Sequence, residues 1–322
     1  MKKHLFILMF VLISFNSCTK KSKVEKEVEK MELNLQIYRF EKAFFETQPE
    51  KLNELKEEYP FFFPKGVPDS VWVRKIENPL WRELYQEVEK KYSDFGKQEK
   101  ELEDLFKHIK YFFPKVIEPK VYTVIADMDY TNKVIYANDK LLISLELYLG
   151  AKHKFYEFPS YIEQNFEERQ ILPDVVTSFS LNLIRPATER TLLSEMIYYG
   201  KQLYLKDQLL PNHNDAEKMG YLPEQITWCQ ENESYVWRYF IEKELLFSTE
   251  SKLANRFINI GPFSKFYLEI DNQSPGRVGQ WIGWQIVRSF MQKNEVSLPE
   301  LLKMDPTEIF EKSKYKPKKT DE

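Results

Sequence analysis

Histidine and cysteine are scarce in this chain of 322 residues. Zinc enzymes commonly hold their metal with imidazole or thiolate groups about one helical turn apart or in closely spaced cysteine pairs. No two of the four histidines (His4, His108, His153 and His213) have this spacing. The two cysteines, Cys18 and Cys229, are far apart in the sequence. The sequence therefore predicts no metal site and does not indicate a disulfide, and Cys229 is expected to be a buried free thiol.

Long apolar runs and an excess of positive charge are also absent. The apolar run over residues 5–15 is shorter than the roughly 20 residues of a membrane-spanning helix. The formal net charge of −3 gives no support to nucleic-acid binding, which favours a basic stripe. The chain has no nucleophile elbow, phosphate-binding loop or dinucleotide fingerprint. We therefore expect neither a cofactor nor a nucleic-acid partner.

The N-terminus has the features of a lipoprotein signal peptide. Lys2 and Lys3 precede the apolar run, whose length fits a signal peptide, and Ser17 places a small residue directly before Cys18. We predict that residues 1–17 are removed and that Cys18 carries a membrane-anchoring lipid. The alternative is an ordinary signal peptide with a cysteine near its end, but the segment lacks the small-x-small site of the ordinary peptidase.

The residues after Cys18 predict where the protein is located. Residues 18–32 are mostly charged, which indicates a solvated tether between the membrane and the domain. No acidic run follows the cysteine directly, and this favours a domain that faces the periplasm. We expect a lipid-anchored protein of the cell envelope, on the outer rather than the inner membrane.

Composition and apolar spacing predict an α+β fold. Only nine glycines are present, beside 24 Phe, 19 Tyr and 6 Trp, which favours a mainly helical domain with a large core. Apolar intervals of three and four predict helices over 41–59, 79–92 and 98–112, and β-branched runs predict strands over 121–126, 133–137 and 141–145. We expect one soluble domain over 33–311 with a small mixed or antiparallel sheet, and a disordered tail over 312–322.

The most informative helix is predicted within residues 185–204. At about 100° per residue, its apolar side chains share one face, and Ser194, Glu195 and Tyr198 cluster on the other. These three have the spacing of the zinc-protease motif H-E-x-x-H, in which two imidazoles bind the metal and the glutamate activates water. Serine and tyrosine cannot supply the imidazole pair. Glu195 is then either a solvated helix residue or part of the lining of a cleft.

A second helix, predicted from Ser274 as cap and Pro275 as first residue, is rich in glycine. Gly276, Gly279 and Gly283 fall on one stripe. A glycine inside a helix costs about 0.5–1 kcal/mol relative to alanine, so the stripe predicts the close approach of another helix.

Four more polar side chains are candidates for the same cleft. Arg277 and Gln280 lie on the glycine-rich helix, and Glu231 and Glu233 lie on a long amphipathic helix predicted over 227–247. The two glutamates are candidates for acid–base work. The alternative for each pair is structural: core packing for the first and a solvated helix face for the second.

Three long blocks and the N-terminus resemble one protein family. The blocks ERTLLSEMIYYGKQLYL, NESYVWRYFIEKELLFST and GRVGQWIGWQIVRSFMQKN, together with the lipidation signal at Cys18, are similar to the gliding-motility lipoprotein B (GldB) family of Bacteroidetes. The resemblance implies an envelope lipoprotein of the gliding-motility apparatus, which is linked to type IX secretion. Its implied partners are the membrane and other envelope proteins of these machineries.

The family is in turn distantly similar to zinc-dependent, zincin-like proteases that carry H-E-x-x-H on the corresponding helix. Carried onto this chain, Glu195 matches the catalytic glutamate, and Ser194 and Tyr198 occupy the metal-ligand positions. The resemblance thus implies a zincin-like domain whose metal ligands are lost. We expect a non-enzymatic scaffold or adaptor, and the alternative is a divergent peptidase or hydrolase.

Overall fold

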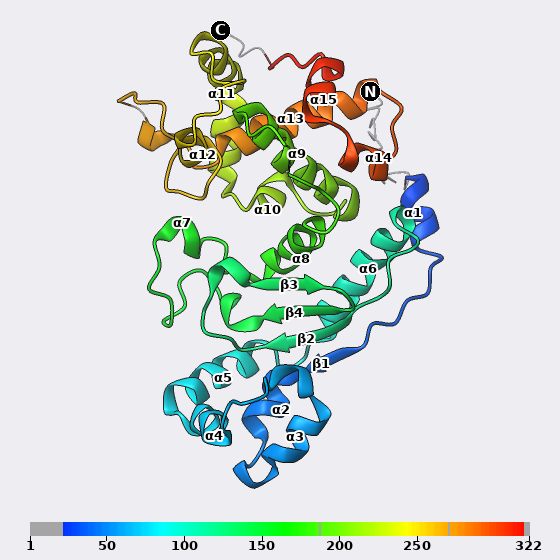
Figure 1. Cartoon of the computed structure of the whole chain (residues 1–322), viewed down its shortest axis with the longest axis vertical. Helices are drawn as coiled ribbons and strands as arrows, with labels where there is room; N and C mark the ends of the chain where they lie inside the picture. Colours follow the sequence, from blue (N-terminus) through cyan, green and yellow to red (C-terminus); the bar gives the residue numbers. More distant parts are fainter. Residues whose placement is uncertain (1–21, 187, 270, 319–322) are drawn as a thin grey trace, which may run out of the picture.

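The computed structural model describes residues 22–186, 188–269 and 271–318, with a four-stranded sheet between two groups of helices (Figure 1). The strands β1 (Ile37–Arg39), β2 (Lys120–Val124), β3 (Val134–Ala137) and β4 (Lys140–Ser144) follow the order β1-β2-β4-β3. β1–β2 and β2–β4 are parallel, whereas β3–β4 is an antiparallel hairpin. The predicted mainly helical α+β fold with a small mixed sheet is confirmed.

Strand β1 is the part of the sheet that the sequence did not predict. Its three residues, Ile37-Tyr38-Arg39, are too few to show an alternating pattern. The hairpin between β3 and β4 turns between the predicted strands 133–137 and 141–145, at Asn138, whose φ of 54° lies in the left-handed region that asparagine tolerates.

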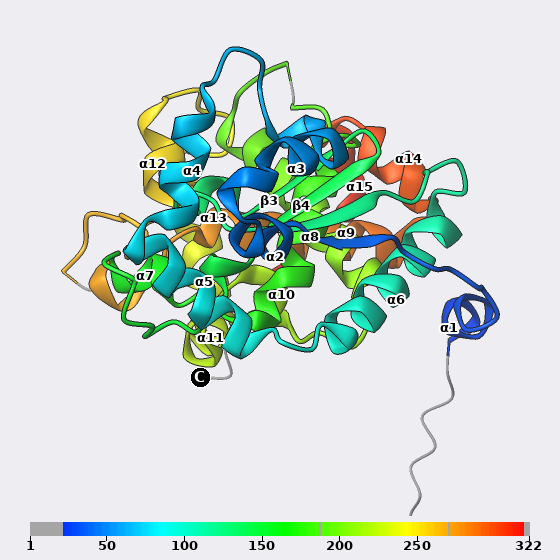
Figure 2. The same cartoon turned by 90° about the horizontal axis from the view of Figure 1, so that it is seen from below.

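Two groups of helices flank the strands (Figure 1). On one side lie α2 (Phe40–Glu46), α3 (Leu52–Glu58), α4 (Asp69–Glu77) and α5 (Pro79–Lys91), below the strands in Figure 1, and Figure 2 views the molecule from this side. The helix expected over 41–59 is therefore two helices, because Pro49 begins a short 3₁₀ helix between them. On the other side α8 (Ile171–Ser180) packs against β3, and α6 (Gly96–Phe112) packs against α8.

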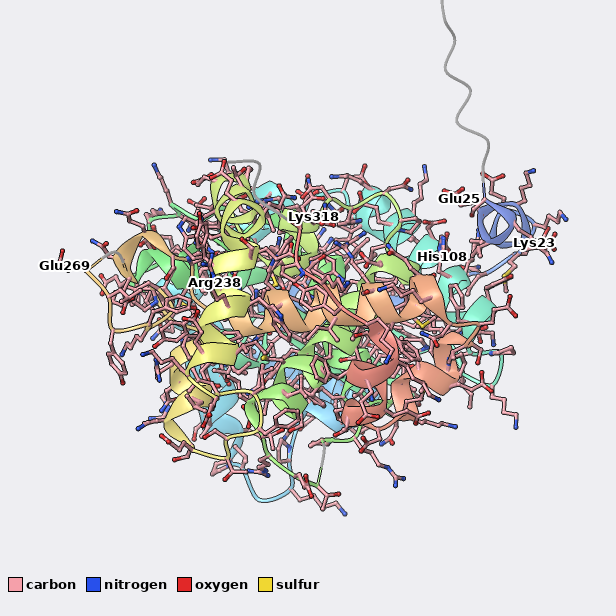
Figure 3. The ribbon with its side chains drawn as sticks, turned by 90° about the horizontal axis from the view of Figure 1, so that it is seen from above. Lys23, Glu25, His108, Arg238, Glu269 and Lys318 are labelled. Carbon is pink, nitrogen blue, oxygen red and sulfur yellow. The ribbon has the colours of Figure 1, made fainter. Side chains whose placement is uncertain are left out.

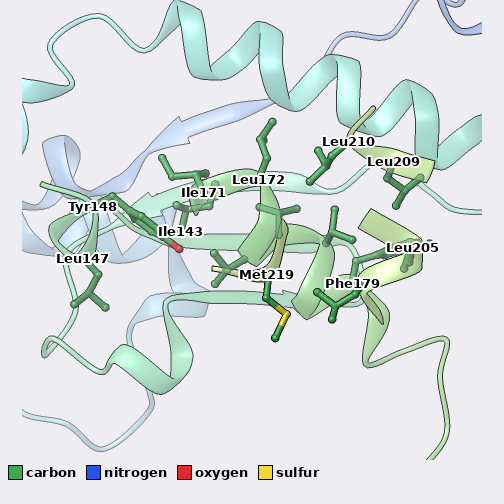
Figure 4. Packing of buried hydrophobic residues seen from close by; sticks show 14 of the residues in the cluster. Ile143, Leu147, Tyr148, Ile171, Leu172, Phe179, Leu205, Leu209, Leu210 and Met219 are labelled. Atoms are coloured by element: carbon green, nitrogen blue, oxygen red, sulfur yellow. The ribbon is translucent and has the colours of Figure 1, made fainter. Parts of the chain in front are cut away.

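The C-terminal half forms a helical layer above α8. It consists of α9 (Leu192–Leu209), α10 (Asp215–Met219), α11 (Pro223–Glu242), α12 (Lys252–Phe257), α13 (Val278–Lys293), α14 (Leu298–Lys303) and α15 (Pro306–Ser313). Figure 4 shows how this layer joins the sheet: Ile143 of β4 lies near Ile171 of α8, and the same cluster of buried residues continues to Phe179 of α8 and Leu205 of α9. The core is thus continuous from the strands to the motif-bearing helix α9.

Helices α9 and α13 approach each other at their glycines. A Cβ on Gly283 would lie 1.8 Å from the carbonyl oxygen of Met196, and one on Gly200 would lie 2.4 Å from that of Gly283. Trp281 and Trp284 are buried beside this crossing. The close helix approach predicted from the glycine stripe is confirmed.

The structure corrects both predicted chain ends. Within the expected tether, Ser22 caps the short helix α1 (Lys23–Val28), which buries Val28 and packs against α6. Figure 3 shows Lys23 and Glu25 at this edge of the molecule. At the other end the described part of the expected tail is packed, because Tyr315 donates a hydrogen bond to Glu233 at 2.6 Å. Cys18 lies outside the described residues.

Candidate functional site

The first turn of α9 fixes the position of Ser194. The side chain of Thr191 caps the helix by accepting a hydrogen bond from the backbone N–H of Ser194 at 3.1 Å. The Ser194 hydroxyl oxygen in turn lies 2.5 Å from the carbonyl oxygen of Glu189 and 2.8 Å from that of Thr191. Ser194 is buried. Its hydroxyl therefore serves the helix start and is not placed as a nucleophile.

Glu195, in the same first turn, and Tyr198, about one turn later, line a pocket of about 290 Å³. We call it the outer pocket; its other lining residues are Pro186, Arg190, Ser194, Tyr199, Ala254, Ile258 and Asn259. Burial raises the pKa of the Glu195 carboxyl, although Arg190 acts in the opposite direction. Burial also raises the pKa of the Tyr198 hydroxyl. Both groups are thus partly withdrawn from water at the wall of a pocket.

A second, larger cavity of about 490 Å³ adjoins the outer pocket. This inner cavity shares Tyr199, Ile258 and Asn259 with the outer pocket, so the two follow one side of α9. Its wall also includes the segment before β3, helix α8, the end of α10 and the start of α13. We refer to the outer pocket and the inner cavity together as the cleft.

Arg277 and Gln280 line the inner cavity, and the helix that carries them starts later than expected. Arg277 has a φ of 67° and stands at the N-cap of α13, which begins at Val278. Ser274 does not cap this helix because its hydroxyl is bonded to the backbone of Ser264 and Asp271. Arg277 donates to the carbonyl oxygen of Gly220 at 3.0 Å.

Gln280 is buried and donates from its side chain to the carbonyl oxygen of Ile258 at 2.8 Å. Both readings of the glycine-rich helix therefore hold, because the helix packs tightly against α9 and its first turn also lines a cavity.

Glu231 and Glu233 do not belong to the cleft. They lie on α11, where Glu231 is exposed and Glu233 is buried. Glu233 accepts hydrogen bonds from the Tyr315 hydroxyl at 2.6 Å and from the Lys318 backbone at 3.4 Å, and Figure 3 shows Lys318 beside this helix. Glu233 holds the C-terminal segment, and Glu231 is solvated. The prediction that these residues share the site of Glu195 is wrong, since α11 packs with this face toward the chain end.

Three charged residues of the inner cavity were not identified from the sequence. Lys133 forms an ion pair with Asp174 of α8, with 2.5 Å between Nζ and Oδ2. Lys206 of α9 donates to the carbonyl oxygen of Lys218 at 2.9 Å, and burial lowers its pKa to about 8. Lys206 follows Glu195 by eleven residues, or about three helical turns. Extending the polar stripe through Tyr199 and Gln202 would have found it.

The described residues hold no group of three or more His, Cys, Asp or Glu side chains arranged to bind a metal ion. His108, His153 and Cys229 lie apart, with His108 bonded to the carbonyl oxygen of Asp104 and His153 near Glu87. Within the same residues, no helix combines the length and the apolar character needed to cross a bilayer.

Comparison with known proteins gives one match. Among curated proteins and among solved structures nothing matches, so the zincin-like resemblance stays an expectation. The family model GldB_lipo, described as "Gliding motility protein GldB", matches residues 21–317, which covers almost all of the described chain. The match includes α9, the cleft and α13. The chain is therefore a member of the GldB family of gliding-motility lipoproteins.

Proposed function

We propose that this lipoprotein is a non-enzymatic adaptor of the gliding apparatus, and that it binds a segment of a partner envelope protein in the cleft. The observation that supports this best is the division of roles on α9. Glu195 and Tyr198 face a pocket, whereas the Ser194 hydroxyl is used by the backbone at the helix start. A binding surface is retained in the place where a zinc protease would hold its metal.

The size and lining of the cleft suit a short stretch of polypeptide. The inner cavity alone has a volume of about 490 Å³, within the usual range for ligand sites of roughly 300–1,000 Å³. Its side-chain amides, including Asn165, Gln170 and Gln202, can exchange hydrogen bonds with a peptide backbone. The partly buried Glu195 and Tyr198 supply a carboxylate and a hydroxyl in the adjoining pocket.

A double variant tests the cleft. Glu195→Gln together with Tyr198→Phe removes a charge and a hydroxyl without changing the side-chain volume much. We expect a folded protein with reduced spreading of gliding colonies and about tenfold lower recovery of the crosslinked partner from intact cells, since hydrogen bonds to charged groups contribute about 1.5–3 kcal/mol. The measurements are colony spreading and in-cell crosslinking with mass spectrometry.

Glu231→Gln is the matched control, because Glu231 is exposed on α11 outside the cleft. It should glide and crosslink like the wild type. Normal spreading and partner recovery in the double variant would contradict the cleft role. The zinc content of the purified protein should be measured in parallel. One zinc ion per chain would favour the alternative, a divergent peptidase or hydrolase.

The anchor forms a separate part of the proposal. We propose that lipid on Cys18 holds the domain on the periplasmic side of the outer membrane. Cys18→Ser should move the protein from the membrane fraction to the soluble fraction, or leave its signal peptide uncleaved, and gliding should fail. Fractionation with immunoblotting measures this. Cys229→Ser is the control, since Cys229 is a buried free thiol. A Cys18→Ser protein that stays on the membrane and supports gliding would exclude the lipid anchor.

A further inference from the structure

The inner cavity carries more positive than negative charge. Among the described residues that line it, Lys133, Lys206 and Arg277 are cationic, and Asp174 is the carboxylate. Asp174 is already used, because Lys133 lies 2.5 Å from its Oδ2 and the Tyr148 hydroxyl donates to it at 2.9 Å. The charges of Lys206 and Arg277 thus have no carboxylate partner in the cavity. Lys206 is buried and Arg277 is half-buried, and a buried charge is usually paired because an unpaired one is costly.

The end of helix α10 holds these two cations on adjacent parts of the wall. Lys206 donates to the carbonyl oxygen of Lys218 at 2.9 Å, and Arg277 donates to that of Gly220 at 3.0 Å. Within the described part of the chain, Lys206 and Arg277 each donate this single hydrogen bond. An ammonium has three donors and a guanidinium has five. Donors on both side chains therefore remain for a ligand.

Capping the end of a helix does not by itself explain why Lys206 and Arg277 face the cavity. Lys201 shows what a lysine with only a capping role looks like. Lys201 also lies on α9, is buried, and has a pKa that burial lowers to about 8. Its ammonium lies within hydrogen-bonding distance of two carbonyls, those of Leu302 and Met304 at the end of α14, and it is not part of the cavity wall. Lys201 has the geometry of a structural cap. Lys206 makes one such bond and also faces the cavity.

A neutral group of the cavity points to a peptide as the ligand. The buried side-chain oxygen of Asn165 has no hydrogen-bond partner within the described part of the chain, so it can accept a bond from a peptide N–H. A guanidinium and an ammonium that bond to carbonyls two residues apart, as Arg277 and Lys206 do, can both donate to one carboxylate. The outer pocket continues from the inner cavity at Tyr199 and has room for the preceding residues.

We propose that the inner cavity binds the C-terminal carboxylate of a peptide between Lys206 and Arg277. This inference rests on the proposed function, because it specifies which end of the partner segment lies in the cleft. The carboxylate completes the charge balance of the two cations, and the amide side chains bind the last peptide groups. The outer pocket, with Glu195, then holds residues farther from the carboxyl end.

The test compares two peptide pools on the purified full-length lipoprotein in detergent. Both pools contain the same N-acetylated random pentapeptides, one with a free C-terminal carboxylate and the other with a C-terminal amide. We expect the wild type to retain the acid pool about tenfold better than the amide pool, as charge-assisted hydrogen bonds predict. Retention is measured by mass spectrometry. Equal retention of the two pools would overturn the proposal without the need for any variant.

Two lysine variants locate the effect. Lys206→Gln should lose the preference for the acid pool, whereas Lys201→Gln, a change at a similarly buried lysine of the same helix, should keep it. Both variants are checked for folding by thermal unfolding. A retained preference in Lys206→Gln, or its loss in Lys201→Gln, would exclude this site. If inorganic phosphate alone stabilises the protein and neither pool is retained, the cavity binds a free anion and the peptide assignment is wrong.

The preference should also depend on pH. Burial lowers the pKa of Lys206 to about 8, with Asp174 opposing this and Arg277 and Lys133 adding to it. The acid preference should therefore weaken as the pH rises through that value, and the pH dependence should disappear in Lys206→Gln. Failure of this inference can be distinguished from failure of the adaptor proposal. Crosslinking that depends on Glu195 and Tyr198 without any acid preference would leave the adaptor in place and remove this inference.

Discussion

Gly283→Ala should lower the free energy of unfolding by about 3 kcal/mol or more, the upper end of what overpacking a core costs. The added methyl carbon would lie 1.8 Å from the carbonyl oxygen of Met196 and 2.3 Å from its carbonyl carbon. These are backbone atoms of a helix, which cannot move aside as the end of a side chain can. Helices α9 and α13 would have to separate at the crossing. Urea unfolding followed by circular dichroism measures the change.

Gly96→Ala is the matched control. Gly96 is the first residue of α6, and a Cβ there would meet mainly the side chain of Asp94, with 3.1 Å to Oδ1. That side chain can rotate away, so the change in stability should stay within about 1 kcal/mol, the range of glycine-to-alanine effects in helices. Equal stability of Gly283→Ala and the wild type would show that α9 and α13 do not cross at these residues.

Arg288→Met should destabilise the protein by up to about 3 kcal/mol, the lower end of the cost of removing one partner from a buried ion pair, because this network is partly buried. The Arg288 guanidinium binds Asp207 at 2.8 Å and Asp215 at 2.8–2.9 Å, and it stacks 3.7 Å from the ring centroid of Trp284. Asp207 also accepts from Trp284 and pairs with Lys218. The network joins α9, α10 and α13, so its loss should loosen the wall of the inner cavity.

Two controls separate geometry from charge. Arg288→Lys keeps the charge but loses the two-pronged contacts, so it should recover only part of the loss. Lys312→Met breaks an exposed pair with Glu308 on α15 and should cost less than about 0.5 kcal/mol. Unfolding in urea compares the three variants. A Lys312→Met protein as unstable as Arg288→Met would contradict the assigned role of the network.

Acid unfolding gives a further measure of the same network. Burial raises the pKa of Asp215, but the hydrogen bonds from Arg288 outweigh it and hold the pKa below its usual value. A carboxylate with a lowered folded-state pKa contributes stability above its unfolded pKa of about 3.9, and this is lost as the pH falls. Stability should therefore fall less steeply below about pH 4 in Arg288→Met than in the wild type.

Local sequence patterns were sufficient to predict features that depend on a single helix or strand. The strands β2, β3 and β4 follow from short β-branched runs between turn residues, and the polar face of α9 follows from helical spacing. The glycine stripe of α13 likewise predicted a close helix approach, because glycine inside a helix needs a compensating contact. These features depend on neighbours in the chain. The partner helix of the stripe, α9, was not predictable from its own pattern.

The candidate site was predictable only on one helix. Ser194, Glu195 and Tyr198 came from one motif spacing, but the residues that share their cleft come from the segment before β3 and from α8, α10 and α13. Glu231 and Glu233 looked equivalent on sequence grounds, yet α11 turns Glu233 toward Tyr315 and leaves Glu231 in solvent. A single sequence gives the face of a helix and not the neighbour that this face meets.

The sequence by itself determined the family and the mainly helical α+β class, because both depend on residue types and short-range spacing. Only the tertiary structure decided that Lys206 and Arg277 both donate to carbonyls at the end of α10, that Asp174 pairs with Lys133, and that α1 packs against the domain. The physical reason is the range of the interactions. Charge pairing and burial depend on distances across the fold, and the chain order does not record them.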